Sequence, residues 1–266
     1  MILELDKLDV SYATRNGPVH AVEGVDLAIG EDEVLGLAGE SGCGKTTLIK
    51  SLLRLLPSGA KVRAEALRFK GRDLSAMSDK AFRREIMWNE ISLVPQSAQA
   101  SLNPVYRVGD QIVEAIREHT DTRASEAVAR VEELFDLVGL EPRLIRAYPH
   151  EFSGGMRQRA MIAMALALDP ALVVMDEPTT GLDPIMGDII DELIVKCVRQ
   201  MGATALSITH DMASAKRISD RIAMLYGGRM IWVGPTRDVD DSGNAYVNQF
   251  IHGLAEGPIA LQAQVR

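Results

Sequence analysis

Short runs in which apolar and polar residues alternate dominate the first third of the chain and predict strands. They are LELDKLDV at 3–10, AVEGVDLAI at 21–29 and the more apolar VLGLAG at 34–39. Helical spacing follows in KTTLIKSLLRLL, at 45–56, and stops before Pro57. A strand, a glycine turn and a helix in this order predict the start of an α/β unit.

From Pro104 to about Leu168 the pattern is mostly helical, with apolar positions at helical spacing in VGDQIVEAIREH and SEAVARVEELFDLVGL. The run MRQRAMIAMALAL, which starts at Met156, predicts a further helix. Two glycines stand directly before this run, and we expect Ser153 to be its N-cap.

The pattern then returns to alternating strands and helices. ALVVMDE reads as a short apolar strand, the segment from Pro184 to Gln200 as a helix, and ATALSITH as another strand. Strands separated by helices predict a parallel sheet, whose ligands bind beyond the carboxyl ends of the strands. The tail from Gly234 onward is rich in turn residues, with one helix expected around Tyr246 to His252.

Composition excludes several classes of function. A net charge of −8 over 266 residues argues against a general nucleic-acid binder. No run approaches the roughly 18 apolar residues of a membrane span, so a membrane role is expected only through a partner. The start MILELDKLDV lacks the features of a signal peptide, so we expect a cytosolic protein. Cys43 and Cys197 lie in unrelated contexts and predict neither a disulfide nor a metal cluster.

The segment GESGCGKT is a full match to GxxxxGK[ST] between a predicted strand and a predicted helix. Glycines at these positions let backbone N–H groups surround the β- and γ-phosphates of a nucleotide, and the helix N-terminus favours negative charge. Lys45 adds a full charge, and the Thr46 hydroxyl can bind Mg²⁺. The predicted nucleotide contacts are Gly39, Glu40, Ser41, Gly42, Cys43, Gly44, Lys45, Thr46 and Thr47.

Two carboxylates end the strand ALVVMDE. We assign Asp176 to the magnesium ion and Glu177 to general-base catalysis, because a carboxylate at a strand end beside a phosphate loop can orient and deprotonate an attacking water. A nucleotide with β- and γ-phosphates, together with Mg²⁺, is therefore expected.

Four further segments carry a resemblance to a known family. Gln96 after ISLVP, the segment FSGGM, the segment GLD at 181–183 and His210 after SIT stand in the order found in ATP-binding-cassette (ABC) ATPases. The chain is similar to this family from about residue 3 to residue 253. The resemblance implies an α/β fold: a P-loop NTPase (RecA-like) core over 1–95 and 171–235 with an N-terminal antiparallel β subdomain. An inserted α-helical subdomain over 96–170 and a tail over 236–266 would complete a single nucleotide-binding domain.

The same resemblance implies that the cofactors are ATP and Mg²⁺, and it implies roles for single residues. Tyr12 would stack on adenine, Gln96 would touch the magnesium ion or the attacking water, and His210 would contact the γ-phosphate. Asp183 would lie in a loop that crosses to a partner subunit.

The segment Ser153, Gly154 and Gly155 would cover the γ-phosphate held by the partner subunit, so catalysis would require a dimer. Phe152 and Met156 depart from the commonest family form, LSGGQ, and Met156 removes one polar contact. The glycines are retained.

The implied partners are transmembrane permease subunits, a second ATPase subunit and a substrate-binding protein, at the cytoplasmic face of the inner membrane, with no nucleic acid. Residues 39–169 resemble ATPases of dipeptide, oligopeptide and nickel importers, although Pro95 stands where these usually have phenylalanine. Residues 181–258 resemble ATPases of phospholipid transporters that maintain lipid asymmetry, and a mosaic sequence is one reading of the two likenesses. Because the permease contact of the family lies around residues 96–111, we expect peptide or nickel import, with phospholipid transport as the alternative. Two alternative functions belong to other classes: an ABC ATPase that serves no transporter, and a regulatory cassette that binds ATP without hydrolysing it.

Overall fold

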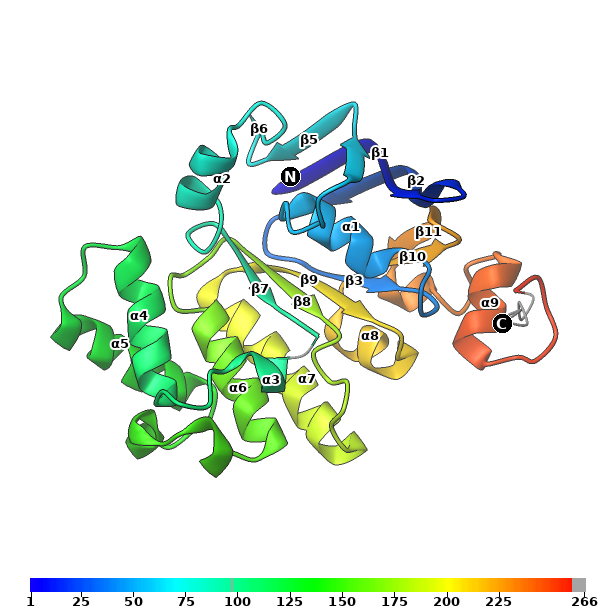
Figure 1. Ribbon diagram of the computed structural model, residues 1–266. Helices are drawn as coiled ribbons and strands as arrows, with labels where there is room; N and C mark the ends of the chain where they lie inside the picture. Colours follow the sequence, from blue (N-terminus) through cyan, green and yellow to red (C-terminus); the bar gives the residue numbers. More distant parts are fainter. Residues whose placement is uncertain (97, 260–266) are drawn as a thin grey trace.

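The structure is a computed structural model of the chain, and it describes residues 1–96 and 98–259. One antiparallel sheet lies on one side of the molecule (Figure 1). Its long central strand pairs with three others over different parts of its length. The strands are β1 (Leu3–Thr14), β2 (Gly17–Ile29), β4 (Ala60–Arg63), β5 (Ala66–Phe69) and β6 (Arg72–Asp73). The expected antiparallel β subdomain is confirmed.

The second sheet is parallel except at one edge, with the strand order β11-β10-β3-β9-β8-β7. Strands β3, β8 and β9 are buried at every position. Burial on both faces explains the apolar runs of β3 and of β8 up to Asp176, whereas β9 contains the buried polar residues Thr204, Ser207 and Thr209. The strands are β3 (Val34–Ala38), β7 (Ile91–Val94), β8 (Leu172–Asp176), β9 (Thr204–Thr209), β10 (Arg221–Tyr226) and β11 (Arg229–Pro235). The carboxyl ends of β3, β9 and β8 therefore lie side by side.

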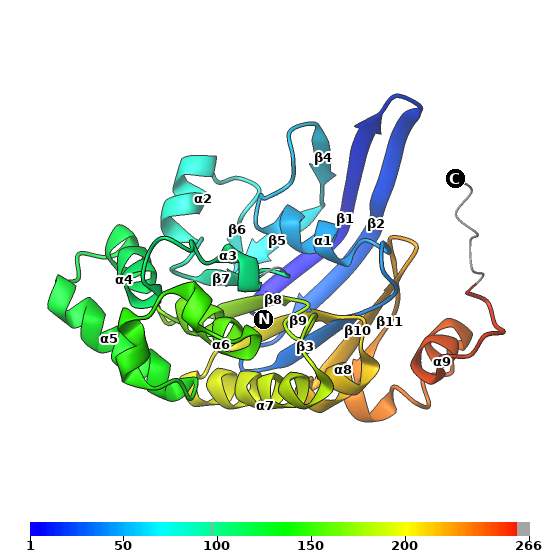
Figure 2. The ribbon, with the colours of Figure 1, turned by 60° about the horizontal axis from the view of Figure 1, so that its bottom comes forward.

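Helices cover the parallel sheet on both faces. Helix α1 packs between the two sheets, where Leu48 and Ile49 share a core with residues of β1 and β3. Helices α7 and α8 lie along the opposite face of the parallel sheet, and α4, α5 and α6 gather at one end (Figure 2). The helices are α1 (Lys45–Leu52), α2 (Asp79–Glu85), α3 (Ala98–Ser101), α4 (Val108–His119), α5 (Ala124–Leu137), α6 (Gly154–Ala165), α7 (Pro184–Met201), α8 (Met212–Ile218) and α9 (Ala245–His252).

The helical region shares its core with the sheet. Val131 and Phe135 of α5 belong to the same buried cluster as Val173 of β8 and Ile194 of α7. This continuous packing fixes the helical region against the sheet in this structure. The subdomain boundaries at residues 96 and 170 stay a prediction.

Three expected boundaries differ from the structure. Helix α6 begins two residues before Met156, because Ser153 caps it and its hydroxyl accepts from the Met156 N–H, and it ends at Ala165. Helix α1 ends at Leu52 rather than Leu56, because Arg54 takes a left-handed conformation (φ 54°) and donates to the carbonyls of Leu74 and Met77. Strands β4 to β6 and helix α2 lie in a segment for which the pattern made no prediction.

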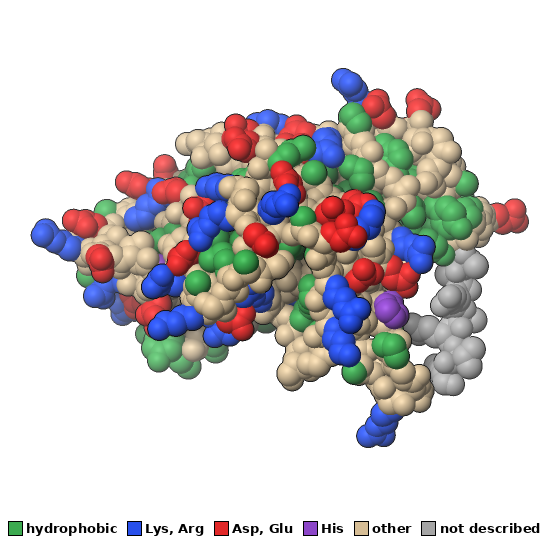
Figure 3. Space-filling model, turned by 90° about the horizontal axis from the view of Figure 1, so that it is seen from above, with side chains coloured by type: hydrophobic (Ala, Val, Ile, Leu, Met, Phe, Trp, Pro, Cys, Tyr) green, Lys and Arg blue, Asp and Glu red, His purple; other side chains and the backbone are tan. Residues whose placement is uncertain are grey.

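Acidic and basic side chains are intermingled on the face above the antiparallel sheet, so this face carries no single basic field (Figure 3). Among the described residues, no helix has the length and apolar character needed to cross a membrane.

Candidate active site

The phosphate loop joins the end of β3 to the start of α1. Gly39 and Gly44 have φ of 149° and 110°. A Cβ atom on Gly39 would lie 2.2 Å from the carbonyl oxygen of Leu225, and one on Gly44 would lie 2.3 Å from that of Ala21. The backbone therefore accepts only glycine at both positions, which gives the predicted glycine turn its steric reason.

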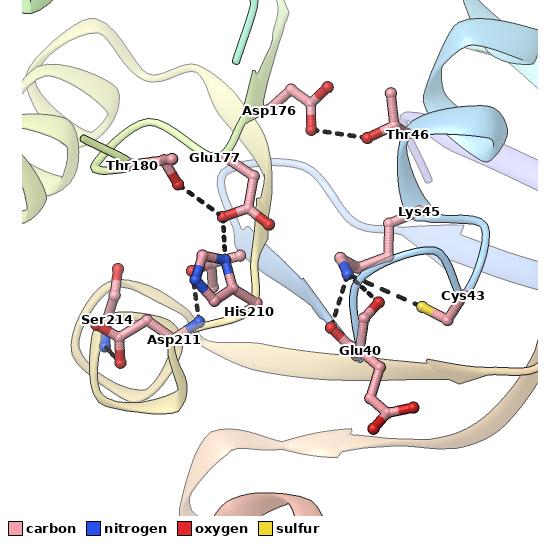
Figure 4. Close-up of polar contacts among 12 residues, drawn as sticks. Glu40, Cys43, Lys45, Thr46, Asp176, Glu177, Thr180, His210, Asp211 and Ser214 are labelled. Carbon is pink, nitrogen blue, oxygen red and sulfur yellow. Dashed lines mark hydrogen bonds and ion pairs between the residues drawn. The ribbon is translucent and has the colours of Figure 1, made fainter. Parts of the chain in front are cut away.

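Lys45 is 6% exposed and points back into its own loop. Its Nζ donates to the carbonyl oxygens of Gly39 at 2.6 Å and of Glu40 at 2.7 Å (Figure 4). These contacts hold the charge at the centre of the loop. The ammonium group of Lys45 would form a stronger hydrogen bond to a charged phosphate oxygen than to either of these neutral carbonyl oxygens.

Thr46 and Asp176 meet across the site although they are 130 residues apart. The Thr46 hydroxyl donates to Oδ1 of Asp176 at 3.2 Å. Asp176 is 5% exposed, and its burial raises the pKa of its carboxyl group, while the bond from Thr46 opposes the rise. A hydroxyl and a carboxylate are oxygen ligands of the kind that Mg²⁺ prefers, so the residue types fit the predicted ion.

Glu177 is held in an unusual geometry. Its backbone has a φ of 55°, in the left-handed region that residues other than glycine rarely occupy, and its N–H donates to the carbonyl of Ile208 on β9. Nδ1 of His210 lies 2.6 Å from Oε2 of Glu177, and the Thr180 hydroxyl donates to the same oxygen at 3.1 Å (Figure 4). Since a carboxylate can only accept, the pairing places a proton on Nδ1. Strain of this kind collects at functional sites, because the surrounding structure must maintain it.

A cavity of about 230 Å³ brings the predicted residues together. Gln96 and Glu177 line it together with the phosphate loop, and Tyr12 lies nearby, with its hydroxyl 3.2 Å from Oγ1 of Thr47. The full lining is Ala21, Ser41, Gly42, Gly44, Lys45, Thr46, Thr47, Gln96 and Glu177.

Several predicted residues do not line this cavity: Asp176 and His210 reach it only through their contacts with Thr46 and Glu177, and Asp183 and the segment 153–155 lie beside each other elsewhere. Asp183 caps α7 by accepting from the N–H of Met186 at 3.0 Å. The methyl group of Met186 covers Gly155, where an added Cβ atom would lie 2.2 Å from Cε. Gly155 thus has a reason to be glycine within its own chain, besides the expected approach of a partner's nucleotide.

Comparison with known proteins decides the family. The family model described as ABC transporter matches residues 22–180, which is more than half of the chain. The chain belongs to the ABC transporter family.

Relatives of this ABC protein include the dipeptide transport ATP-binding protein DppD of Bacillus subtilis. That protein is 39% identical over 241 residues, which are 90% of this chain and 72% of the relative. A putative peptide import ATP-binding protein of Brucella ovis is 40% identical over 246 residues, again 90% of this chain and 72% of the relative. Among solved structures, the dimeric post-hydrolysis state of the ATP-binding cassette MJ0796, bound to ADP and Pi, is 26% identical. It has a TM-score of 0.76 and covers 88% of this chain and 99% of that one. The P-loop fold and the ATPase class expected from the sequence are confirmed.

The sequence analysis missed three residues that support the predicted site residues of this ABC ATPase directly or through a neighbouring helix. Thr180 bonds to Glu177, Met186 covers Gly155, and Asp191 lies buried between α7 and α8. A threonine in a turn and an apolar or acidic residue on a helix carry no signal of their own, so no pattern in the sequence could have marked them.

Proposed function

We propose that this ATPase hydrolyses ATP within a head-to-tail dimer and that it drives peptide import through a membrane permease at the cytoplasmic face of the membrane. The observation that carries the hydrolysis is the arrangement of Glu177. Its carboxylate lines the same cavity as the phosphate loop, and His210 holds it from the side.

The phosphate loop binds the nucleotide in this proposal. Lys45 exchanges the carbonyls of Gly39 and Glu40 for phosphate oxygens, and each charge-assisted bond contributes about 1.5–3 kcal/mol. Thr46 and Asp176 would hold Mg²⁺, directly or through water, and that ion supplies neutralisation of phosphate charge when bound. Among the described residues no three acidic, histidine or cysteine side chains gather as a metal cluster, and an ion that binds mainly through phosphate oxygens needs none.

Glu177 accepts the proton of the attacking water. Both His210 and Thr180 contact Oε2, so we assign Oε1 to the water. The bond to Nδ1 fixes the imidazole ring of His210 and leaves Nε2 for the γ-phosphate. Because Nδ1 already donates to Glu177, Nε2 donates to a phosphate oxygen only when the ring carries both protons. Tyr12, on β1 beside Thr47, stacks on the adenine, and Gln96 contacts the ion or the water from the far wall of the cavity.

The dimer supplies what one chain lacks. Ser153, Gly155 and Asp183 do not line the cavity that contains Lys45 and Glu177, and Ser153 and Asp183 are engaged as the N-caps of α6 and α7. A second subunit in head-to-tail orientation brings them to that nucleotide. ATP then offers a γ-phosphate to both subunits and ADP does not, so the two nucleotides favour different dimer states.

The permease contacts the segment 96–111 and its surroundings. Val105 and Tyr106 are 71% and 58% exposed, which is unusual for two adjacent apolar residues. A separate cavity of about 390 Å³ lies at the end of α1 and beside α2, and the stacked rings of Trp88 and His119 form part of its wall. Its wall combines apolar residues with Arg54, Asp79 and Arg83, so it can receive a short segment of a membrane subunit that has both apolar and charged side chains.

Peptide import is preferred to phospholipid transport because the likeness to peptide-import proteins covers both halves of the chain. The curated relatives named for dipeptide, oligopeptide or peptide transport match 87% to 100% of it, at 33% to 40% identity. The likeness therefore does not stop near residue 169. A substrate-binding protein outside the membrane would deliver the peptide to the permease.

The transport proposal is tested by co-expressing the tagged chain with a peptide-importer permease pair and, separately, with a lipid-asymmetry permease. We expect the peptide permeases to copurify and to stimulate ATP hydrolysis. Capture and stimulation by the lipid permease alone would move the assignment to phospholipid.

The hydrolysis proposal is tested by Glu177→Gln, with the exposed Glu192→Gln on α7 as the matched control. Removing a general base lowers turnover by about 10²–10⁴-fold. We expect Glu177→Gln to bind ATP, to remain a dimer in size-exclusion chromatography with ATP, and to release almost no phosphate. Turnover close to that of Glu192→Gln would show that Glu177 is not the base.

A further inference from the structure

A buried carboxylate that the proposed mechanism does not use lies between α7 and α8. Asp191, on α7, is 1% exposed. Its Oδ1 accepts from the Ser214 hydroxyl at 2.8 Å, and its Oδ2 accepts from Nη1 of Arg217 at 2.9 Å. Burial raises the pKa of Asp191, and the bond from Ser214 and the charge of Arg217 oppose the rise. Both partners belong to α8, so one carboxylate ties two turns of that helix to α7.

Helix α8 depends on such contacts for its position. It has seven residues, and an isolated helix of that length is not stable in water. Its N-cap is Asp211, whose carboxylate accepts from the N–H groups of Ala213 and Ser214. The residue before this cap is His210, whose side chain is 60% exposed and contacts Glu177 (Figure 4). A shift of α8 would therefore also move the backbone of His210, which directly precedes the N-cap.

Helix α7 carries a second contact at its first turn. Asp183 caps it, and Met186 covers Gly155 of the segment proposed to meet the partner's nucleotide. Asp191 lies about two turns further along the same helix. Helix α7 thus contacts Gly155 through Met186 and contacts α8 through Asp191. Helix α8 in turn leads to His210.

We propose that Asp191 is a positioning residue for ATP hydrolysis: it fastens α8, and with it His210, to the helix that contacts Gly155. This inference rests on the proposed function, because it assumes that His210 and Glu177 act in hydrolysis. Asp191 does not contact the nucleotide in this proposal. Loss of the tie lets α8 shift, and the bond between His210 and Glu177 forms in a smaller fraction of the molecules.

A purely structural role for Asp191 would predict something different. It would lower the stability of the whole chain, but each folded molecule would hydrolyse ATP at the normal rate. The two roles are separated by measuring kcat per ATP-binding site at a temperature well below unfolding, together with the local opening of α8.

Asp191→Asn tests the proposal, because asparagine keeps the shape and loses the charge that binds Arg217. Asp188→Asn is the matched control: Asp188 is on the same helix and also contacts Arg217, but its side chain is 62% exposed. Val131→Ala, on α5, is a control for general loss of core packing. Ser214→Ala removes one of the two bonds to Asp191, and it replaces Asp191→Asn if the latter does not fold.

The first readout is amide hydrogen exchange over residues 208–218 of the chain without nucleotide, which needs no activity. We expect Asp191→Asn to speed exchange in this segment by about tenfold, and both controls to leave it unchanged. The second readout is steady-state hydrolysis, in which we expect kcat to fall about tenfold while KM for ATP changes by less than about twofold. Ser214→Ala is expected to show the same pattern with about a threefold fall in kcat.

The outcomes separate this inference from the function on which it rests. Unchanged exchange in Asp191→Asn and in Ser214→Ala would overturn the inference, and so would faster exchange with a normal kcat per site. An equal loss of kcat in Val131→Ala would also overturn it, because the effect would then be general. If the unmodified chain hydrolyses no ATP, the proposed function fails, while the exchange data still decide whether Asp191 holds α8.

Discussion

The contact between Met186 and Gly155 permits a quantitative test of packing at the segment that is proposed to face the partner. In Gly155→Ala the new Cβ atom would lie 2.2 Å from Cε of Met186. Apolar carbon atoms rest at about 3.5–4.0 Å, so Cε has to retreat by at least about 1.3 Å. Overpacking of this size costs about 1–3 kcal/mol, and the flexible end of a methionine favours the lower value.

An opposing effect is also present, because alanine is preferred to glycine within a helix by about 0.5–1 kcal/mol. We therefore expect Gly155→Ala to lower the free energy of unfolding by up to about 1 kcal/mol. In a Met186→Ala background the clash is gone, and the same change should be neutral or stabilising. The difference between the two backgrounds should be about 1–2 kcal/mol, or a shift in Tm of about 2–8 °C.

The assay is thermal and urea unfolding of the four chains of the double-mutant cycle, without nucleotide, so that the proposed role of Gly155 in the dimer does not enter. Gly187→Ala is the matched control, since Gly187 lies in the same helix as Met186 and its added Cβ would come no closer than 3.8 Å to Thr179. It should raise Tm. An equal effect of Gly155→Ala in both backgrounds would refute the contact with Met186 as the reason for glycine at this position.

Three further predictions concern the nucleotide site and the thiols. Lys45→Ala should weaken ATP binding at least about tenfold, because it removes charge-assisted bonds to phosphate. It should also lower Tm, because the carbonyls of Gly39 and Glu40 lose their donor. Titration with a fluorescent nucleotide and thermal melting measure these two effects, and normal ATP affinity would contradict the role assigned to Lys45. Tyr12→Ala should raise KM for ATP by about 5–150-fold through lost stacking while Tyr12→Phe changes it little, so equal effects would point to the hydroxyl instead. Burial raises the pKa of Cys197 to about 11 and raises the pKa of Cys43 above its usual value. At pH 8 both side chains are therefore thiols, which should react slowly with iodoacetamide in the folded chain and quickly in urea. Rapid labelling of Cys197 in the folded chain would contradict its burial.

Much of the fold could be predicted from the sequence because the signals are local. The buried runs that became β3 and β8 are apolar except for Asp176 at the end of β8. Helix α4 has the predicted limits because its apolar positions recur at helical spacing. The segment 57–90 gave no such signal. Its strands β4 and β5 have only four residues each, and β4 is mostly exposed, so their hydrogen bonds to β1, rather than their own pattern, determine them.

The sequence by itself determined the phosphate loop, the acidic end of β8 and the order of the family's motifs, since each depends on spacing along a few residues. Tertiary structure decided the rest, because these contacts join residues far apart in the chain. It set Glu177 in a left-handed conformation against His210, placed Met186 over Gly155, and enclosed Asp191 between two donors of α8. No local pattern encodes such pairs, because the free energy that selects them comes from burial and hydrogen bonding in the assembled fold.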